Sequence, residues 1–170
     1  MQPTFYSSRI LLPVRPWFIV FSVFVALLLN FLPTSAWPWM PDWVALVLIF
    51  WSIREPRRVG MGVAFLLGLI MDVAEASLLG QHARAYVAVS YTAAAISRRL
   101  LWFPLAQQAL HVLPLLLLAQ AIMVLVRLLA GAEFPGWAYF LSSLGSALLW
   151  TPLSFLLLLP QYQPDERDDN

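Results

Sequence analysis

Two carboxylates, Asp72 and Glu75, and one imidazole, His82, stand together in an otherwise apolar stretch, GLIMDVAEASLLGQHA. Positions three apart lie on one face of a helix, so Asp72 and Glu75 share a face that also includes Gly68. Carboxylates and imidazoles can ligate metal ions or transfer protons. Here the three donors come from one helix and the loop after it, and they follow no metal-site spacing. We therefore expect no metal site.

The chain offers no other recognisable centre for catalysis. It contains no cysteine, which excludes disulfides, thiolate metal sites and a cysteine nucleophile. No serine lies in a G-x-S-x-G pattern with a base, and the phosphate-binding pattern G-x-x-x-x-G-K-[ST] is absent. These features predict a protein that is not an enzyme, has no catalytic residues and binds no cofactor.

The composition places these residues in a membrane protein. Of the 170 residues, 61% are hydrophobic and 11% are charged, and the mean hydropathy is +0.77. Long apolar runs of this kind are typical of integral membrane proteins. The net charge of +1 gives no electrostatic reason to expect a nucleic-acid partner.

We predict an all-α integral membrane protein, with a single transmembrane domain over residues 1–160 built from about six helices. The acidic end of the chain, residues 161–170, is predicted to be a disordered cytoplasmic tail. The second and fourth spans are short for a hydrocarbon core of about 30 Å, so four crossings with two half-spans are the alternative topology. The predicted spans are Trp17–Ala36, Trp43–Ile53, Val59–Leu79, Ala85–Ser97, Leu105–Leu129 and Ala138–Leu159.

Arginine placement predicts that both termini face the cytoplasm. Cytoplasmic loops of membrane proteins carry an excess of basic residues. With the N-terminus inside, only Arg84 and Arg127 fall on the outer side. The basic hairpin REPRR after the second span is expected to touch anionic membrane lipid. The arginines on the inner side are Arg9, Arg15, Arg54, Arg57, Arg58, Arg98, Arg99 and Arg167.

A carboxylate inside a membrane span is costly and usually faces a polar partner or a cavity. At 1.5 Å per residue, Asp72 lies about 20 Å from the inner end of its predicted helix, and Asn30 and Gln120 lie at the same depth. We therefore predict a polar layer around Asp72, which is either a structural hydrogen-bond cluster or a ligand pocket. Its predicted members are Asp72, Asn30, Gln120 and Tyr91, with Arg127 or Arg84 as the countercharge.

The middle of the chain has prolines, glycines, aromatic residues and charged residues in a recognisable order. A proline opens an apolar run that ends in an aromatic–Trp pair, and a proline-basic hairpin, a glycine, a G-x-x-x-D and an L-G follow. These positions are Pro41, Trp51, Pro56, Arg57, Gly60, Gly68, Asp72 and Gly80. In this order they resemble the MreD family of rod shape-determining membrane proteins, and the resemblance covers roughly residues 15–159. Glu75 belongs to no part of the pattern, so Asp72 is the better candidate for a functional residue.

The resemblance implies a non-enzymatic scaffold subunit of the machinery for lateral cell-wall growth, in the bacterial inner membrane. The implied partner is MreC, within an elongation complex that includes RodA, a penicillin-binding transpeptidase and MreB; a homodimer is left open. The implied fold is similar to the S components of energy-coupling-factor transporters. The alternative function is a small-molecule carrier of that type, with a polar pocket lined by Asn30, Asp72, Tyr91 and Gln120.

Overall fold

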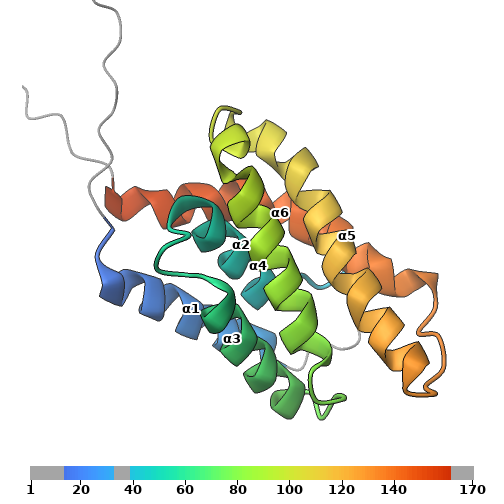
Figure 1. The fold of residues 1–170 in the computed structure, drawn as a ribbon. Helices are drawn as coiled ribbons and strands as arrows, with labels where there is room; N and C mark the ends of the chain where they lie inside the picture. The colour runs from blue at the N-terminus through green and yellow to red at the C-terminus, as the bar shows by residue number, and fades with distance from the viewer. Residues whose placement is uncertain (1–13, 33–38, 162–170) are drawn as a thin grey trace, which may run out of the picture.

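Six α-helices and two short 3₁₀ turns form the part of the chain that the computed structural model describes, residues 14–32 and 39–161 (Figure 1). No strand occurs within these ranges. Nearly all of the predicted acidic tail lies outside them, so its disorder stays a prediction. The elements are α1 (Pro16–Asn30), α2 (Trp43–Arg54), α3 (Met61–Ala74), α4 (Gln81–Leu100), α5 (Leu105–Leu129), η1 (Trp137–Phe140), α6 (Leu141–Leu158) and η2 (Leu159–Gln161).

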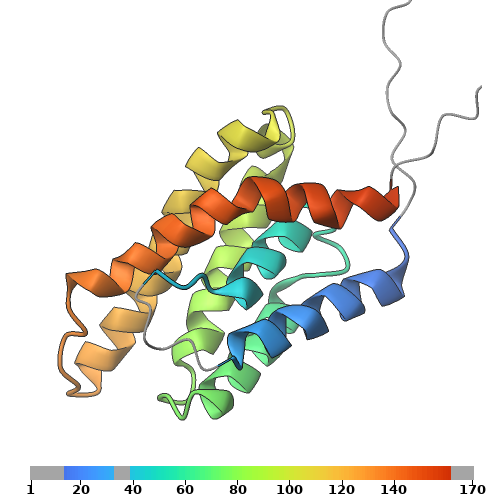
Figure 2. The same cartoon turned by 180° about the vertical axis from the view of Figure 1, so that it is seen from behind.

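The short second helix lies at the centre of the bundle. It contains 12 residues, and every side chain from Val44 to Ile53 is buried. It packs against α4 on one side and against α1 and α6 on the other, as the two opposite views show (Figures 1 and 2). A helix enclosed in this way meets other helices rather than lipid. This explains how an apolar helix shorter than a bilayer core is accommodated.

The third and fourth helices differ from their predicted spans. The third span was expected to run to Leu79, but α3 ends at Ala74. The fourth was expected to be short, and this is wrong, because α4 begins at Gln81 and contains 20 residues. The first N–H groups of a helix need acceptors, and here the carboxylate of Asp72 supplies them from α3. Asp72 therefore lies in the last turn of α3, not deep inside a longer span.

α3 and α4 pack backbone against backbone at Gly68. A Cβ atom placed on Gly68 would lie 2.3 Å from Cα of Ala83 and 2.7 Å from the carbonyl carbon of His82. No side chain fits at that distance. This contact sets the spacing of the two helices that carry Asp72 and His82.

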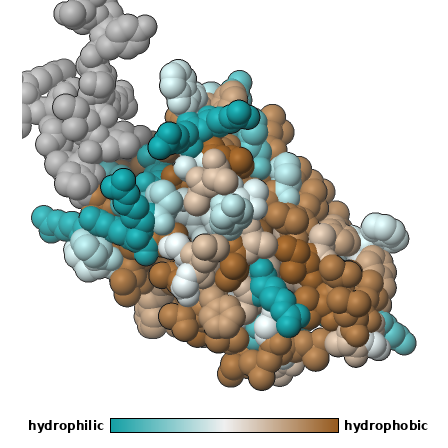
Figure 3. Space-filling view, in the orientation of Figure 1, coloured by the Kyte–Doolittle hydropathy of each residue, from teal (hydrophilic) through white to brown (hydrophobic). Residues whose placement is uncertain are grey.

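The outer surface of the bundle is largely apolar (Figure 3). Among its exposed side chains are Phe21, Leu66 and Leu125. Within the described ranges, two stretches are long and apolar enough to cross a membrane, Leu105–Leu129 and Trp137–Gln161, while α1, α2 and α3 are shorter apolar helices. These features suit a membrane protein, and the six-crossing arrangement stays a prediction.

Candidate functional site

The carboxylate of Asp72 holds the start of α4. Its Oδ1 accepts a hydrogen bond from the backbone N–H of His82 at 2.8 Å, and its Oδ2 accepts one from the N–H of Gly80 at 2.7 Å. The N–H of Ala83 lies 3.5 Å from Oδ2, and the hydroxyl of Ser77 donates to Oδ1 at 3.0 Å. Asp72 is 1% exposed. It acts as an N-cap supplied from a neighbouring helix, and these donors offset the cost of burying its charge.

The chain reverses between these two helices through a tight turn. Ala76 has a φ of 49° and Gly80 has a φ of 91°, a left-handed conformation that glycine adopts at least cost. The N–H of Ser77 donates to the carbonyl oxygen of Asp72 at 3.0 Å, which closes the turn over the carboxylate. The L-G pair of the sequence pattern is therefore the element that aims the first N–H groups of α4 at Asp72.

His82 joins both carboxylates of the opening stretch. Its Nδ1 lies 2.9 Å from Oδ1 of Asp72, and its Nε2 lies 3.4 Å from Oε2 of Glu75. An ionised carboxylate only accepts hydrogen bonds, so Nδ1 carries a proton. The second nitrogen faces a carboxylate rather than a hydroxyl. The arrangement therefore positions the imidazole but does not activate a nucleophile in the manner of a Ser-His-Asp triad.

Glu75 lies at the rim of this cluster, just beyond the end of α3, and its side chain is 49% exposed. Burial raises the pKa of Glu75, the nearby charge of His82 lowers it, and the carboxylates of Asp42 and Asp72 raise it further. The net direction is upward. Among the described residues, no group of three or more metal-ligating side chains has a metal-binding arrangement.

A second carboxylate inside the bundle, the half-buried Asp42, was missed by the sequence analysis. It caps α2 by accepting from the N–H of Ala45 at 2.9 Å. It also accepts from Asn30 Nδ2 at 3.1 Å and from the hydroxyl of Tyr86, which lies 3.0 Å and 2.8 Å from its two oxygens. The available signal was an aspartate directly before the apolar run WVALVLIF, which is the pattern of a helix N-cap.

The hydrogen-bonded groups around Asp42 and around Asp72 are linked through side chains of α4. The ring of Tyr86 lies edge-on to the ring of His82, with 5.8 Å between centroids. Asn30 completes the link to α1, because its Oδ1 accepts from the N–H of Trp43 at 2.9 Å. Hydrogen bonds and this ring contact together connect α1, α2, α3 and α4.

Gln120 belongs to a separate cluster between α5 and α6. Its amide nitrogen donates to the carbonyl oxygen of Tyr139 at 3.0 Å and to the hydroxyl of Ser142, and its amide oxygen accepts from the hydroxyl of Ser143. These bonds fasten α5 to the start of α6.

A cavity of about 610 Å³ lies between the two clusters. Leu29, Leu116 and Met123 contribute apolar wall, and Pro41 of the sequence pattern also lines it. Its polar lining includes Asn30, Asp42, Glu75, His82, Gln120 and Ser146.

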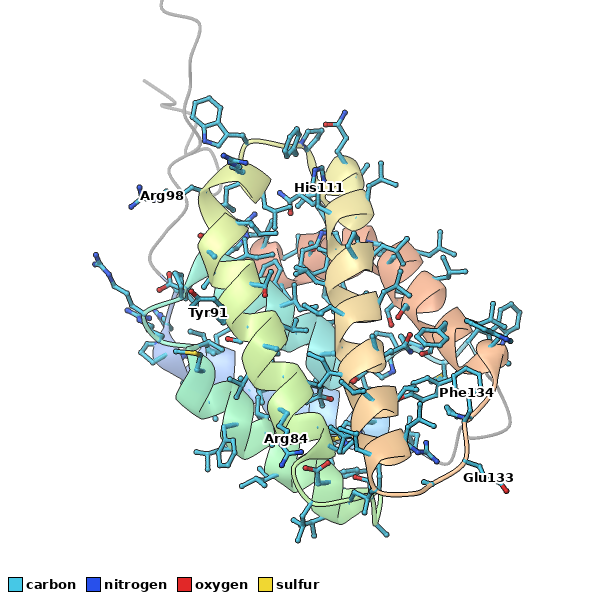
Figure 4. All side chains as sticks on the ribbon, turned by 45° about the vertical axis from the view of Figure 1, so that its right-hand side comes forward. Arg84, Tyr91, Arg98, His111, Glu133 and Phe134 are labelled. Atoms are coloured by element: carbon cyan, nitrogen blue, oxygen red, sulfur yellow. The ribbon has the colours of Figure 1, made fainter. Side chains whose placement is uncertain are left out.

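The predicted polar layer is thus only partly correct in its geometry. Asn30 and Gln120 line one cavity, but Asp72 does not reach it, because its carboxylate is turned toward the start of α4. Tyr91 is 62% exposed on the outer side of α4 (Figure 4). Five residues along a helix turn by roughly 140°, which takes Tyr91 away from the inward face marked by Tyr86.

In the described ranges, neither Arg127 nor Arg84 donates a hydrogen bond to Asp72, and an arginine countercharge for it stays a prediction. The acceptor contacts of Asp72 are filled by Ser77, Gly80, His82 and Ala83. Arg127 does not line the cavity, although its charge acts on Tyr139 at the cavity wall.

The remaining residues of the sequence pattern shape the region around α2. Trp51 is fully buried, and its indole N–H donates to the hydroxyl of Ser22 in α1 at 2.9 Å. Pro56 and Arg57 form the turn after α2, and Gly60 is the residue before α3. Their positions are structural, since they set where two helices begin and end.

Comparison with known proteins assigns this arrangement to a family. The model of the family described as "rod shape-determining protein MreD" matches residues 8–159. The chain belongs to the MreD family. The rod shape-determining protein MreD of Haemophilus influenzae is 36% identical over 155 residues, covering 85% of this chain and 91% of that protein. No solved structure matches the chain, so the expected likeness of MreD to S components stays a prediction.

Proposed function

We propose that the protein is a non-enzymatic membrane subunit of the machinery that determines rod shape. Family membership supports the role in cell shape. The observation that carries the non-enzymatic part is the structural role of the polar side chains between the helices. Asp72 caps α4, Asp42 caps α2, and Gln120 fastens α5 to α6. Groups that could do chemistry are committed to holding helices in place.

The subunit acts by binding another membrane protein, for which MreC is the candidate. Through MreC it joins an elongation complex with RodA, a penicillin-binding transpeptidase and MreB. The apolar outer surface supports this role, because membrane helices associate by close packing of such faces.

Both termini lie on the cytoplasmic side of the inner membrane. Arg98 lies at the end of the bundle opposite Arg84 and Glu133 (Figure 4). At the α2–α3 turn, Arg58 donates to the carbonyl oxygen of Val14 at 2.7 Å, which ties that basic turn to the beginning of α1. These positions support the inside-positive orientation.

Co-purification tests the partner. Tagged protein is expressed with MreC, solubilised, and assayed for retained MreC, with Asp72→Leu and Gly62→Ala as a matched pair. Gly62 has open space around it. We expect the wild type and Gly62→Ala to retain MreC, and Asp72→Leu to retain less. Failure of wild-type protein to retain MreC, when both accumulate normally, would refute the proposal.

One observation favours the alternative of a small-molecule carrier, namely the cavity. Its volume of about 610 Å³ falls in the range of ligand-binding pockets. Mass spectrometry of the protein released intact from mild detergent would detect a retained molecule.

A further inference from the structure

We propose that the cavity binds the primary ammonium group of a mainly apolar molecule. This inference goes beyond the role in cell shape and does not depend on it, because it concerns a site that can be measured in the purified protein. It rests on the charge of the cavity, on its unsatisfied polar groups and on its walls.

Two carboxylates, Asp42 and Glu75, line the cavity. In the described ranges its basic lining is the imidazole of His82, and no arginine lines it there. The chain contains no lysine at all. Both oxygens of Asp42 already accept hydrogen bonds. Among the described residues, Glu75 contacts only the imidazole of His82, at 3.4 Å. Glu75 is therefore the carboxylate in the lining with the most acceptor capacity left for a ligand.

One further polar group in the lining lacks a partner. Ser146 is 1% exposed, and its hydroxyl makes no hydrogen bond to any residue that the structure describes. Buried polar groups in proteins are nearly always hydrogen-bonded. An unpartnered hydroxyl in a cavity that also holds the partly satisfied carboxylate of Glu75 indicates that a ligand supplies the missing partner.

The remaining lining defines the rest of the ligand. Leu29, Leu116 and Met123 form apolar walls around the polar groups. A primary ammonium has three hydrogen-bond donors and no acceptor, so it matches a carboxylate and a hydroxyl. A metal ion would need several oxygen ligands, and Asp42 is already engaged by protein donors. Such an ammonium group is carried both by free arylalkylamines and by the ethanolamine headgroup of phospholipids.

Binding is measured on purified protein in nanodiscs made of phosphatidylcholine and phosphatidylglycerol. The probe is phenethylamine, its control is 2-phenylethanol, and the readouts are the unfolding temperature and tryptophan fluorescence, since Trp43 lines the cavity. We expect saturable binding of the amine and none of the alcohol. Equal responses to both would overturn the proposal, as would no response to either the amine or the lipid described below.

Three variants locate the site. Glu75→Gln should weaken the binding of phenethylamine at least tenfold, equivalent to about 1.4 kcal/mol. Glu133→Gln removes an exposed acid outside the cavity and should change nothing (Figure 4). Arg127→Gln removes the positive charge near Tyr139 and should tighten binding. Unchanged affinity in Glu75→Gln, or weaker binding in Arg127→Gln, contradicts the assignment.

A second set of nanodiscs containing phosphatidylethanolamine distinguishes the two sources. If the lipid headgroup is the ligand, these nanodiscs raise the unfolding temperature and block phenethylamine. If the ligand is a free amine, they leave its affinity unchanged. Retention of MreC is scored separately, so failure of amine binding and failure of the cell-shape role are distinct results.

Discussion

The carboxylate of Asp72, in the last turn of α3, accepts a hydrogen bond from the backbone N–H of His82, in the first turn of α4, at 2.8 Å. One side chain thus fixes where the next helix begins. The same carboxylate receives the N–H of Gly80 on its other oxygen. The two helices are joined through main-chain groups that every substitution at position 82 except proline retains.

Replacement of Asp72 should therefore destabilise the protein in a graded way. Asp72→Leu leaves every donor unpaired, at about 1–3 kcal/mol for each buried group. Asp72→Asn keeps one acceptor oxygen but turns an NH₂ toward the remaining donors, so it should rescue only in part. The measurement is thermal unfolding in detergent, with Glu133→Leu as control. Full stability of Asp72→Leu would show that the cap is dispensable.

Alanine substitutions at Gly68 and at Gly62, both in α3, provide a test and its matched control. Gly68→Ala places a Cβ 2.3 Å from Cα of Ala83, so α3 and α4 must separate, and we expect poor accumulation and a lower unfolding temperature. Gly62→Ala meets nothing within 4 Å and should be neutral or stabilising, by up to about 1 kcal/mol from helix propensity. Equal behaviour of the two variants would contradict the close contact.

The raised pKa of Glu75 predicts a pH effect. The folded state holds this proton more tightly than the unfolded state, so its contribution to stability is present at low pH and is lost as pH rises through the native pKa. His82, Asp42 and Asp72 act on the group. Wild type and Glu75→Gln should unfold at similar temperatures at about pH 4. At about pH 8 the wild type should unfold at a lower temperature than Glu75→Gln. A constant difference across this range would argue against the shift.

Topology can be tested with reporter fusions at Gln2 and after Asp169. Both should report a cytoplasmic location, because the arginines gather on that side. A periplasmic signal from either fusion rules out an arrangement with both ends inside.

Hydropathy alone predicted the bounds of α5, because that helix is a long and mostly apolar segment with proline before it. It did not predict the start of α4, where GQHAR reads as a loop. A distant carboxylate stabilises that turn, and local propensity carries no information about such a partner.

The site was predictable to a similar degree. Counting 1.5 Å per residue from the inner ends of the predicted helices placed Asn30 and Gln120 at the same depth, and both line the cavity. It failed for Asp72 because α3 ends five residues earlier than the apolar pattern does. Asp42 was overlooked because it lies at the edge of an apolar run, where an acid looks like part of a loop.

The enclosure of α2 has a consequence for how the protein is made. Its 12 residues extend about 18 Å, less than the hydrocarbon core of a bilayer. While the chain is being synthesised, this segment leaves the ribosome before α4 and α6 exist to surround it. Its stable insertion must therefore wait for later helices, and a nascent chain halted before α4 should be recognised as defective by membrane quality control.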